Sequence, residues 1–184
     1  MVSNPSTEDA QHTTEYSTFE GLFVRALKVD DALKAKFKTI GFDMERPVPK
    51  YPTRIWRAVV EAGRQHFYPN LSVADGRREL GRVALTGFLG TISGRFLSVV
   101  LSVMVSPAAL VLRLPRFFTM TRTGVEMTVH KETENQWRLI ARDIFGDPDF
   151  VAGIIEGPGK KTDSNFTIEI QNVTPAGYEL VFRW

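Results

Sequence analysis

The side chains that most often bind metals or act as nucleophiles are few and far apart in this chain. The sequence contains three histidines, His12, His66 and His130, and no cysteine. A zinc site needs several such ligands in a cluster, and a thiolate site needs cysteine. One histidine is enough to bind heme iron, which leaves His66 as a candidate, although a partly exposed histidine at a helix end is the simpler interpretation. We therefore expect no metal and no cofactor.

Carboxylate pairs suggest capping of helices and not catalysis. Asp30 and Asp31 are adjacent, and Asp147 and Asp149 are two residues apart. Both pairs stand where helices are expected to begin, and acidic side chains at that position accept hydrogen bonds from free backbone N–H groups. The chain shows neither a Gly-x-Ser-x-Gly motif nor a Ser-His-Asp order. We expect a protein that is not an enzyme.

A glycine-rich segment, residues 87–96 (GFLGTISGRF), superficially resembles a phosphate-binding loop. A P-loop requires a lysine directly after its last glycine, and this segment has none. Gly90 and Gly94 instead form a small-x-x-x-small pair, which lets two backbones approach closely. The glycines allow close packing of another backbone, a break in the helix, or a cavity wall. As an interface, we predict Gly87, Gly90 and Gly94 in a homodimer or a contact with a protein partner.

Aromatic residues around this segment are candidates for a pocket. Such pockets are mostly apolar with a few polar anchors, and Arg95 is the one charge in an otherwise apolar stretch. Arg95 could equally reach water from a helix end, and aromatic residues at helical spacing are more often core than pocket. The predicted ligand-binding residues are Trp56, Tyr68, Phe88, Thr91, Arg95 and Phe96.

Composition bounds the partners of this protein. The 184 residues carry a formal charge of +2 with no basic tract, so we expect no nucleic-acid binding. Residues 96–112 form an uncharged stretch of 17 residues, shorter than the roughly 20 that a membrane span requires. We expect a buried or interface helix there and no membrane contact. The polar beginning of the chain lacks the pattern of a secretory signal, which predicts a cytoplasmic protein.

Periodicity predicts helices first and strands later. Apolar residues at helical spacing indicate helices from 19, from 31 to 40, from 52 to 67 and from 73 onward, and a short helical piece over 108–114. From residue 117 the period changes to two, which predicts strands near 125–129, 137–142, 166–170 and 178–184, with a short helix over 150–156. We therefore predict an α+β fold, in which a helical N-terminal half precedes an antiparallel sheet of four to five strands with one short helix inserted. Residues 1–17 are expected to be a flexible tail, and 18–184 one domain.

The order of several short motifs resembles a paralogous family of uncharacterised myxobacterial proteins. The motifs are GLFVRAL, IGFD, YPTRIW, FYPNLS, RRELGR, GTISGR, FVAGIIEG and YELVFRW, and the resemblance spans residues 19–184. That family in turn resembles the four-vinyl-reductase-type domains, the TRAPP subunits and the heme–nitric-oxide sensor domains. The resemblance implies a ligand-sensing or protein-interaction role, often in a dimer, and it supplies no catalytic residues.

Two hypotheses follow from the residues and the resemblance together. The first is a non-catalytic sensory or regulatory module that binds a small apolar or amphipathic molecule in a hydrophobic pocket. The second is a dimeric structural or signalling protein that interacts through the glycine-rich helix and binds no ligand.

Overall fold

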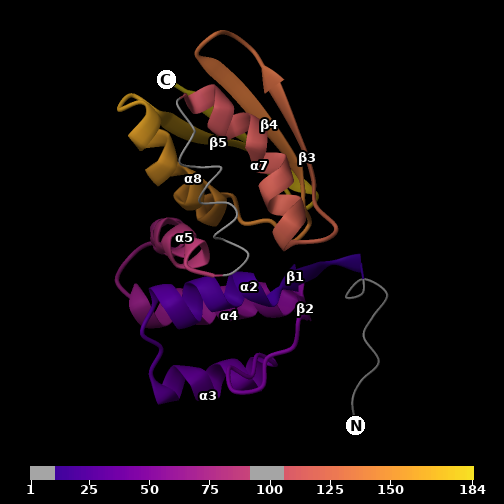
Figure 1. The fold of residues 1–184 in the computed structure, drawn as a ribbon, viewed down its shortest axis with the longest axis vertical. Helices are drawn as coiled ribbons and strands as arrows, with labels where there is room; N and C mark the ends of the chain where they lie inside the picture. Colours follow the sequence, from indigo (N-terminus) through magenta and orange to yellow (C-terminus); the bar gives the residue numbers. More distant parts are fainter. Residues whose placement is uncertain (1–10, 92–105) are drawn as a thin grey trace.

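The computed structural model describes residues 11–91 and 106–184 (Figure 1). They form a helical part, with a two-stranded sheet, and a second part in which helices cover a four-stranded antiparallel sheet. The predicted α+β fold, with its helical first half and a helix inserted in the sheet, is confirmed.

The helical part follows the periodic segments of the sequence. Its elements are α2 (Tyr16–Phe19), the π-helix η1 (Glu20–Ala26), α3 (Asp31–Ile40), α4 (Thr53–Phe67) and α5 (Val73–Leu89). Asp30 caps α3 by accepting a 2.8 Å hydrogen bond from the Leu33 N–H, and Gly41 ends this helix with a φ of 107°. Only glycine adopts that conformation at little cost. Ser72 caps α5 in the same way as Asp30 caps α3, through the N–H of Asp75.

A small antiparallel sheet ties the start of the described chain to the helices. Strand β1 (Thr13–Glu15) pairs with β2 (Lys50–Pro52). The sequence places residues 13–15 in a flexible tail, whereas the structure places them in this strand. No apolar alternation marks so short a strand, because its stability comes from backbone hydrogen bonds and from the burial of the Thr14 side chain.

A cluster of aromatic side chains forms the core of the helical part. Phe19 lies 4.6–4.9 Å, ring centre to ring centre, from Phe42, Tyr51 and Trp56, and Phe23 packs on Phe37 at 4.8 Å. Aromatic pairs at such distances add stability beyond the area that they bury. The core therefore fixes α2, η1, α3 and α4 relative to one another.

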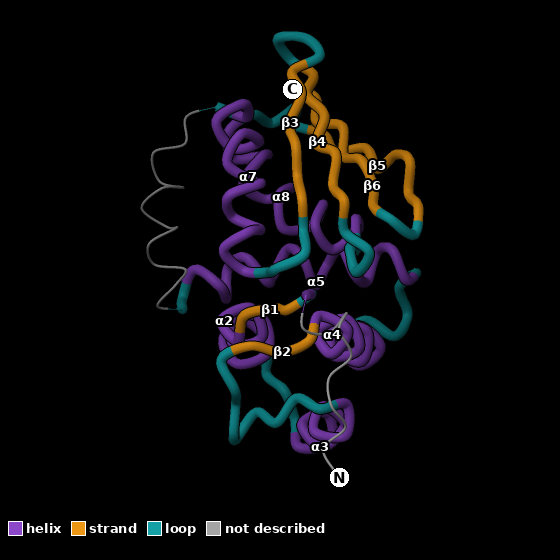
Figure 2. The backbone as a smooth tube through the Cα atoms, turned by 90° about the vertical axis from the view of Figure 1, so that its right-hand side faces the viewer, coloured by secondary structure: helices purple, strands orange, loops and turns teal. Residues whose placement is uncertain are grey.

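The second part begins with a helix and contains the larger sheet. Its elements are α7 (Pro107–Thr121), β3 (Glu126–Lys131), β4 (Gln136–Arg142), α8 (Pro148–Thr162), β5 (Thr167–Thr174) and β6 (Gly177–Arg183). The strand order is β3-β4-β6-β5, with every neighbouring pair antiparallel. Helices α7 and α8 lie on the same side of the sheet (Figure 2).

Alternation along the strands separates a buried face from a polar face. On the inner face Leu139 pairs with Leu180, and both are fully buried. On the outer face Arg138 forms ion pairs with Glu132 and Glu179, each at 2.5 Å. Side chains alternate between the two faces of a strand, so the apolar face of the sheet packs against α7 and α8. The outer face is mainly polar, although Val181, opposite Arg138, is fully buried there.

Two helices are longer than the sequence indicates. Helix α7 extends to Thr121, beyond the expected end at 114, and α8 continues through Gly157, Pro158 and Gly159 to Thr162. Both contain a proline in their interior, which removes one backbone donor and lowers the helical signal. Tertiary packing outweighs that cost. A Cβ at Gly159 would overlap the Phe166 ring, which shows how closely this turn of α8 packs against the residues after it.

Helix α5 joins the two parts, and its glycines explain how closely it approaches its neighbours (Figure 1). A Cβ at Gly87 would overlap the carbonyl oxygen of Gly21 in η1, and one at Gly81 would overlap that of Phe150 in α8. Of the three explanations for the glycines, close packing of another backbone within the chain is the one seen at these two positions. The described residues contain no helix long and apolar enough to cross a membrane.

Candidate functional site

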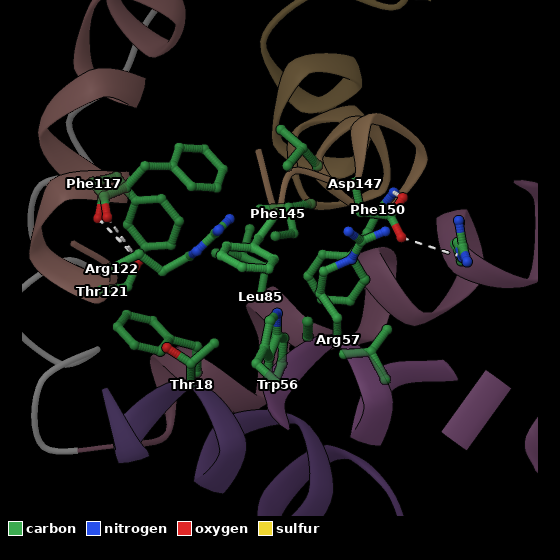
Figure 3. Close-up of a pocket in the computed structure, with 17 residues that line it drawn as sticks. Thr18, Trp56, Arg57, Leu85, Phe117, Thr121, Arg122, Phe145, Asp147 and Phe150 are labelled. Atoms are coloured by element: carbon green, nitrogen blue, oxygen red, sulfur yellow. Dashed lines mark hydrogen bonds and ion pairs between the residues drawn. The ribbon is translucent and has the colours of Figure 1, made fainter. Parts of the chain in front are cut away.

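A small cavity, which we call the interlayer cavity, lies where the helical part meets the second part (Figure 3). Its walls are mainly aromatic and aliphatic. Its volume is about 60 Å³, less than half of the roughly 150 Å³ of an engineered apolar cavity that holds benzene. The cavity therefore accommodates a molecule of a few heavy atoms without rearrangement.

Helical periodicity brings the apolar wall residues together. Residues four apart lie on the same face of a helix, and each wall helix contributes such a pair. The pairs are Trp56 and Val60 in α4, Ala84 and Phe88 in α5, Phe117 and Thr121 in α7, and Phe150 and Ile154 in α8. The Phe88 and Phe117 rings meet edge to face at 5.5 Å, one from each part.

One charged residue of the wall, Arg122, belongs to a buried ion pair with Asp143. Arg122 donates from Nη1 to Oδ2 of Asp143 at 2.7 Å and from Nη2 to Oδ1 at 2.9 Å. The Arg122 side chain is 8% exposed and that of Asp143 is fully buried. A bidentate arginine–carboxylate pair of this kind is both strong and geometrically specific. It leaves the wall at Arg122 close to electrically neutral.

Backbone contacts from distant segments hold this pair in place. Arg122 follows α7 and forms an isolated antiparallel bridge with Thr14 of β1. Asp143 follows β4, and its backbone N–H donates to Ala176 before β6 at 3.0 Å. Its carboxylate also accepts a 3.1 Å hydrogen bond from the Phe145 N–H. The pair therefore connects the helical part, α7 and the sheet.

Two polar atoms of the cavity wall have no hydrogen-bond partner among the described residues. They are Nε of Arg122 and Oγ1 of Thr18, and both are shielded from solvent. A buried donor left unpaired is costly, so such atoms are uncommon and indicate either a binding role or strain. Figure 3 shows Arg122 extending toward Phe145 in the centre of the cavity, with Thr18 on the opposite wall.

Charged residues line the rim of the cavity. Asp147 caps α8 and forms an ion pair with Arg77 of α5 at 3.2 Å, drawn as the dashed line at the right of Figure 3. Burial raises the pKa of Asp147, and the nearby Arg77 guanidinium only partly opposes this effect. Arg57 of α4 is exposed at the same rim. The rim is therefore polar, whereas the interior is apolar.

An open polar groove adjoins the rim and shares Arg57, Arg77 and Asp147 with the interlayer cavity. Tyr178 lines this groove, and burial is the main cause that raises its pKa. The Tyr178 hydroxyl has no hydrogen-bond partner within the described part of the chain. The groove gives the rim of the cavity access to solvent.

The structure brings together only some of the residues predicted to bind a ligand. Trp56 and Phe88 line the interlayer cavity. Tyr68 does not line it and ends α4 beside Gly76, while the Thr91 hydroxyl donates to the Phe88 carbonyl at 2.7 Å, after the end of α5. The two remaining candidates, Arg95 and Phe96, lie outside the described residues.

Of the three predicted interface glycines, the structure describes two. Gly87 packs against Gly21 of the same chain, and a Cβ at Gly90 would lie 3.4 Å from Cδ of Arg25. Gly94 lies outside the described residues. Dimerisation through these glycines stays a prediction.

The sequence did not indicate Thr18 and Arg122 of the cavity wall, or Asp143, which pairs with Arg122. Arg122, Asp143 and Thr18 are isolated residues of common types, separated by more than one hundred positions between first and last. No spacing rule connects them, because the fold of the whole chain brings them together. One feature of the sequence could have drawn attention to the ion pair. Arg122 and Asp143 carry opposite charges and stand before and after the two predicted strands, residues 125–129 and 137–142.

A family model matches residues 12–184, nearly the whole chain, and its description is "Protein of unknown function (DUF2378)". The chain belongs to the DUF2378 family. No curated protein matches this DUF2378 chain significantly. The expected membership of an uncharacterised family is thereby confirmed.

Solved H-NOX structures resemble this DUF2378 protein in fold. The Fe(II) unliganded H-NOX protein from K. algicida matches with a TM-score of 0.67 and 10% identity, covering 92% of this chain and 95% of that one. A Cs H-NOX mutant matches at 0.63 and 15%, covering 91% and 92%. A structure concerned with heme redox potential and porphyrin distortion matches at 0.61 and 12%, covering 91% and 96%. These identities show a shared fold alone.

The residues of the interlayer cavity do not fit a heme. Heme iron is held by histidine, cysteine, methionine or tyrosine, and none of these is among the described residues that line the cavity. His66 lies 3.5 Å from Asp30 in the helical part, and His130 is exposed on β3. His12 packs edge to face on Phe145 at 5.3 Å and does not itself line the cavity. Phe117, Phe118 and Phe145 occupy the interior instead. Among the described residues, no group of three metal-ligating side chains occurs.

Proposed function

We propose that this DUF2378 protein is a non-catalytic, regulatory small-molecule-binding module whose ligand occupies the interlayer cavity without heme. The observation that carries the proposal is an apolar cavity with two buried, unpaired polar atoms in its wall. Binding sites typically combine an apolar lining with a few placed polar groups. The likeness in fold to H-NOX structures supports the proposal, since the K. algicida protein is described as an unliganded form, which implies that it binds a ligand.

The lining also argues against catalysis. Its described residues include no histidine, cysteine, serine or lysine, and the other residues able to act as bases or nucleophiles are Asp147, Thr18 and Thr121. The Thr121 hydroxyl donates to the Phe118 carbonyl of its own helix. Asp147 is engaged with Arg77 and with the first turn of α8. The lining fits a regulatory role better than a catalytic one. A ligand in the interlayer cavity would contact both the helical part and the second part, and would thereby favour one packing of these parts over another.

Xenon provides a direct test, since it enters dry apolar cavities and has no polar chemistry. Xenon dissolved under pressure should shift the backbone amide NMR signals of Ala84, Phe88 and Phe117, in a saturable way. The variant Ala84→Leu should abolish these shifts while the protein remains folded, because the larger side chain fills the cavity. Ala58→Leu, the same substitution on the exposed side of α4, is the matched control and should retain them.

The outcomes separate clearly. Saturable shifts that disappear only in Ala84→Leu support a binding cavity. Shifts that are absent from the wild-type protein, or that persist unchanged in Ala84→Leu, would contradict the proposal.

A further inference from the structure

We infer that the ligand of the interlayer cavity is an uncharged small molecule with a carbonyl-type hydrogen-bond acceptor, to which Arg122 donates through Nε. This inference rests on the proposed function and specifies the ligand class. It is argued from the donors in the wall, from the charge that the wall already balances, and from the size of the cavity.

The donor is a single N–H group in an apolar environment. Arg122 is 9% exposed, and its Nε has no acceptor in residues 11–91 and 106–184. A guanidinium can only donate hydrogen bonds, so the missing partner must be an acceptor. The two terminal nitrogens already bind Asp143, which fixes the plane of the guanidinium and therefore the direction of Nε–H.

The charge of Arg122 is not available to attract an anion. Asp143 balances it through two short hydrogen bonds at a fully buried carboxylate. A carboxylate ligand at Nε would therefore bring a negative charge beside Asp143, which is unfavourable. The other two arginines of the described lining, Arg57 and Arg77, lie at the rim, and Arg77 is already paired with Asp147. A neutral carbonyl oxygen accepts the same hydrogen bond without adding charge.

The opposite wall favours the same ligand class. The Thr18 hydroxyl, without a partner in the described part of the chain, can donate or accept. Trp56 rises from α4 with its indole nitrogen toward the cavity, and an indole N–H only donates (Figure 3). Two walls that offer donors match a group with two acceptor lone pairs, as a carbonyl oxygen has.

The volume sets the scale of the ligand. Scaled from the ~150 Å³ cavity that holds the six heavy atoms of benzene, about 60 Å³ corresponds to roughly two or three heavy atoms. Acetone, the smallest ketone, has four heavy atoms, so its entry requires a small outward movement of the wall. Acetate is its anionic counterpart of nearly the same shape. The two molecules therefore differ mainly in charge.

NMR titration of the wild-type protein with acetone, acetate and xenon tests the inference. Acetone should shift the Arg122 Nε–H signal downfield in a saturable way, because a hydrogen bond to this group forms. Acetate at equal concentration should bind at least about tenfold more weakly, as expected when a buried charge is left uncompensated. Xenon should bind without a downfield shift of the Nε–H signal.

A conservative variant adds a second readout without disturbing the ion pair. Thr18→Val replaces a hydroxyl by a methyl group of similar size and should weaken acetone binding about fivefold, the usual effect of one neutral hydrogen bond. Xenon binding should be retained. Thr119→Val is the matched control on the exposed side of α7, where the hydroxyl bonds to Arg116 of its own helix, and it should not change acetone binding.

Each outcome decides one question. A saturable Nε–H shift with acetone, together with weaker acetate binding, supports the inference. Tighter binding of acetate than acetone, or acetone binding with an unmoved Nε–H signal, would overturn it while leaving the proposed cavity function intact. If xenon too fails to bind to the wild-type protein, both this inference and the proposed function are overturned.

Discussion

Arg122 and Asp143 show how a buried pair of charges can serve both stability and binding. The pair costs desolvation, which its two hydrogen bonds and the Phe145 N–H offset. Its position between α7, β1 and the end of β4 means that neither residue can move without disturbing the junction. The same geometry leaves Nε as a fixed donor in the cavity wall.

Removing one member of this pair should be strongly destabilising. Asp143→Ala leaves the Arg122 cation buried without a partner, and we expect a loss of about 3–5 kcal/mol in the free energy of unfolding. Urea denaturation followed by circular dichroism measures this loss. The neighbouring Arg142→Ala is the control, because its pair with Glu126 is more than three-quarters exposed on both sides, and a change below about 0.5 kcal/mol is expected. Equal losses in the two variants would contradict our account of the buried pair.

Glu61 connects α4 to α5 and makes stability depend on pH. It accepts hydrogen bonds from Arg64 at 2.8 and 3.0 Å and from Arg77 at 3.1 and 3.3 Å. The hydrogen bond from Arg64 is the main cause that lowers the pKa of Glu61 below 4.5, and Arg77 contributes further, against the opposing effect of burial. A lowered pKa in the folded state means that the stabilisation is present above the unfolded value and is lost as the pH falls through the folded value.

The variant Glu61→Gln tests this linkage. At pH 7 it should be less stable than the wild type by about 1 kcal/mol, in keeping with a partly exposed network. The difference should shrink as the pH falls below about 4.5, because the wild-type carboxylate becomes protonated. Urea denaturation from pH 7 to pH 3 measures both curves. Two parallel curves over this range would show that Glu61 is not responsible.

At the scale of elements, α5 determines how the two parts meet. It packs on η1 at Gly87 and on α8 at Gly81, in each case so closely that a side chain would overlap backbone. Glycine in a helix interior costs roughly 1 kcal/mol in helix propensity. The close approach of three elements offsets this cost.

The effect of a glycine substitution on stability should therefore depend on what the added Cβ contacts. Gly87→Ala should destabilise by about 2–3 kcal/mol, because η1 must move away from its Cβ. Gly157→Ala, on the exposed side of α8, should instead stabilise by about 0.5–1 kcal/mol, because no described atom lies within 4 Å of the added Cβ. Thermal unfolding measures both variants. A neutral Gly87→Ala would mean that η1 and α5 do not require this close contact.

At the scale of the whole molecule, the fold resembles that of H-NOX proteins while the residues of the cavity differ from a heme site. The K. algicida H-NOX protein and the Cs H-NOX mutant each match about nine-tenths of the chain, at 10% and 15% sequence identity. A fold can be shared by proteins of different function, because function depends on the residues of the site. The described lining of the cavity contains phenylalanines and a paired arginine, and none of the residue types that hold heme iron.

Hemin should therefore not form a specific complex with this protein. We expect a titration monitored by visible absorption to show no stoichiometric, histidine-ligated spectrum, and the melting temperature to stay unchanged, since no ligand stabilises the folded state. An H-NOX protein titrated in parallel provides the positive control. A stoichiometric complex would contradict this expectation, and His12→Ala, His66→Ala and His130→Ala would then identify the ligand.

The sequence by itself determined the class of the fold and most of its elements, because they depend on local patterns. The caps at Asp30 and Ser72, the helical spacing of Trp56 and Val60, and the alternation around Leu139 and Leu180 each require only neighbouring residues. It also indicated Trp56 and Phe88 as pocket candidates, and both line the cavity. The ends of α7 and α8 escaped prediction because tertiary packing overrides the helix-breaking tendency of a proline.

Only the tertiary structure decided where the polar groups of the cavity wall lie and which of them are paired. Thr18, Arg122 and Asp143 come from α2, the end of α7 and the end of β4, and their contacts depend on the docking of the two parts across α5. Nonlocal contacts of this kind leave no periodic signal in the sequence. The physical reason is that apolar burial fixes the packing of the helices and the sheet, and the few polar groups at their junction acquire their partners, or lack them, as a consequence.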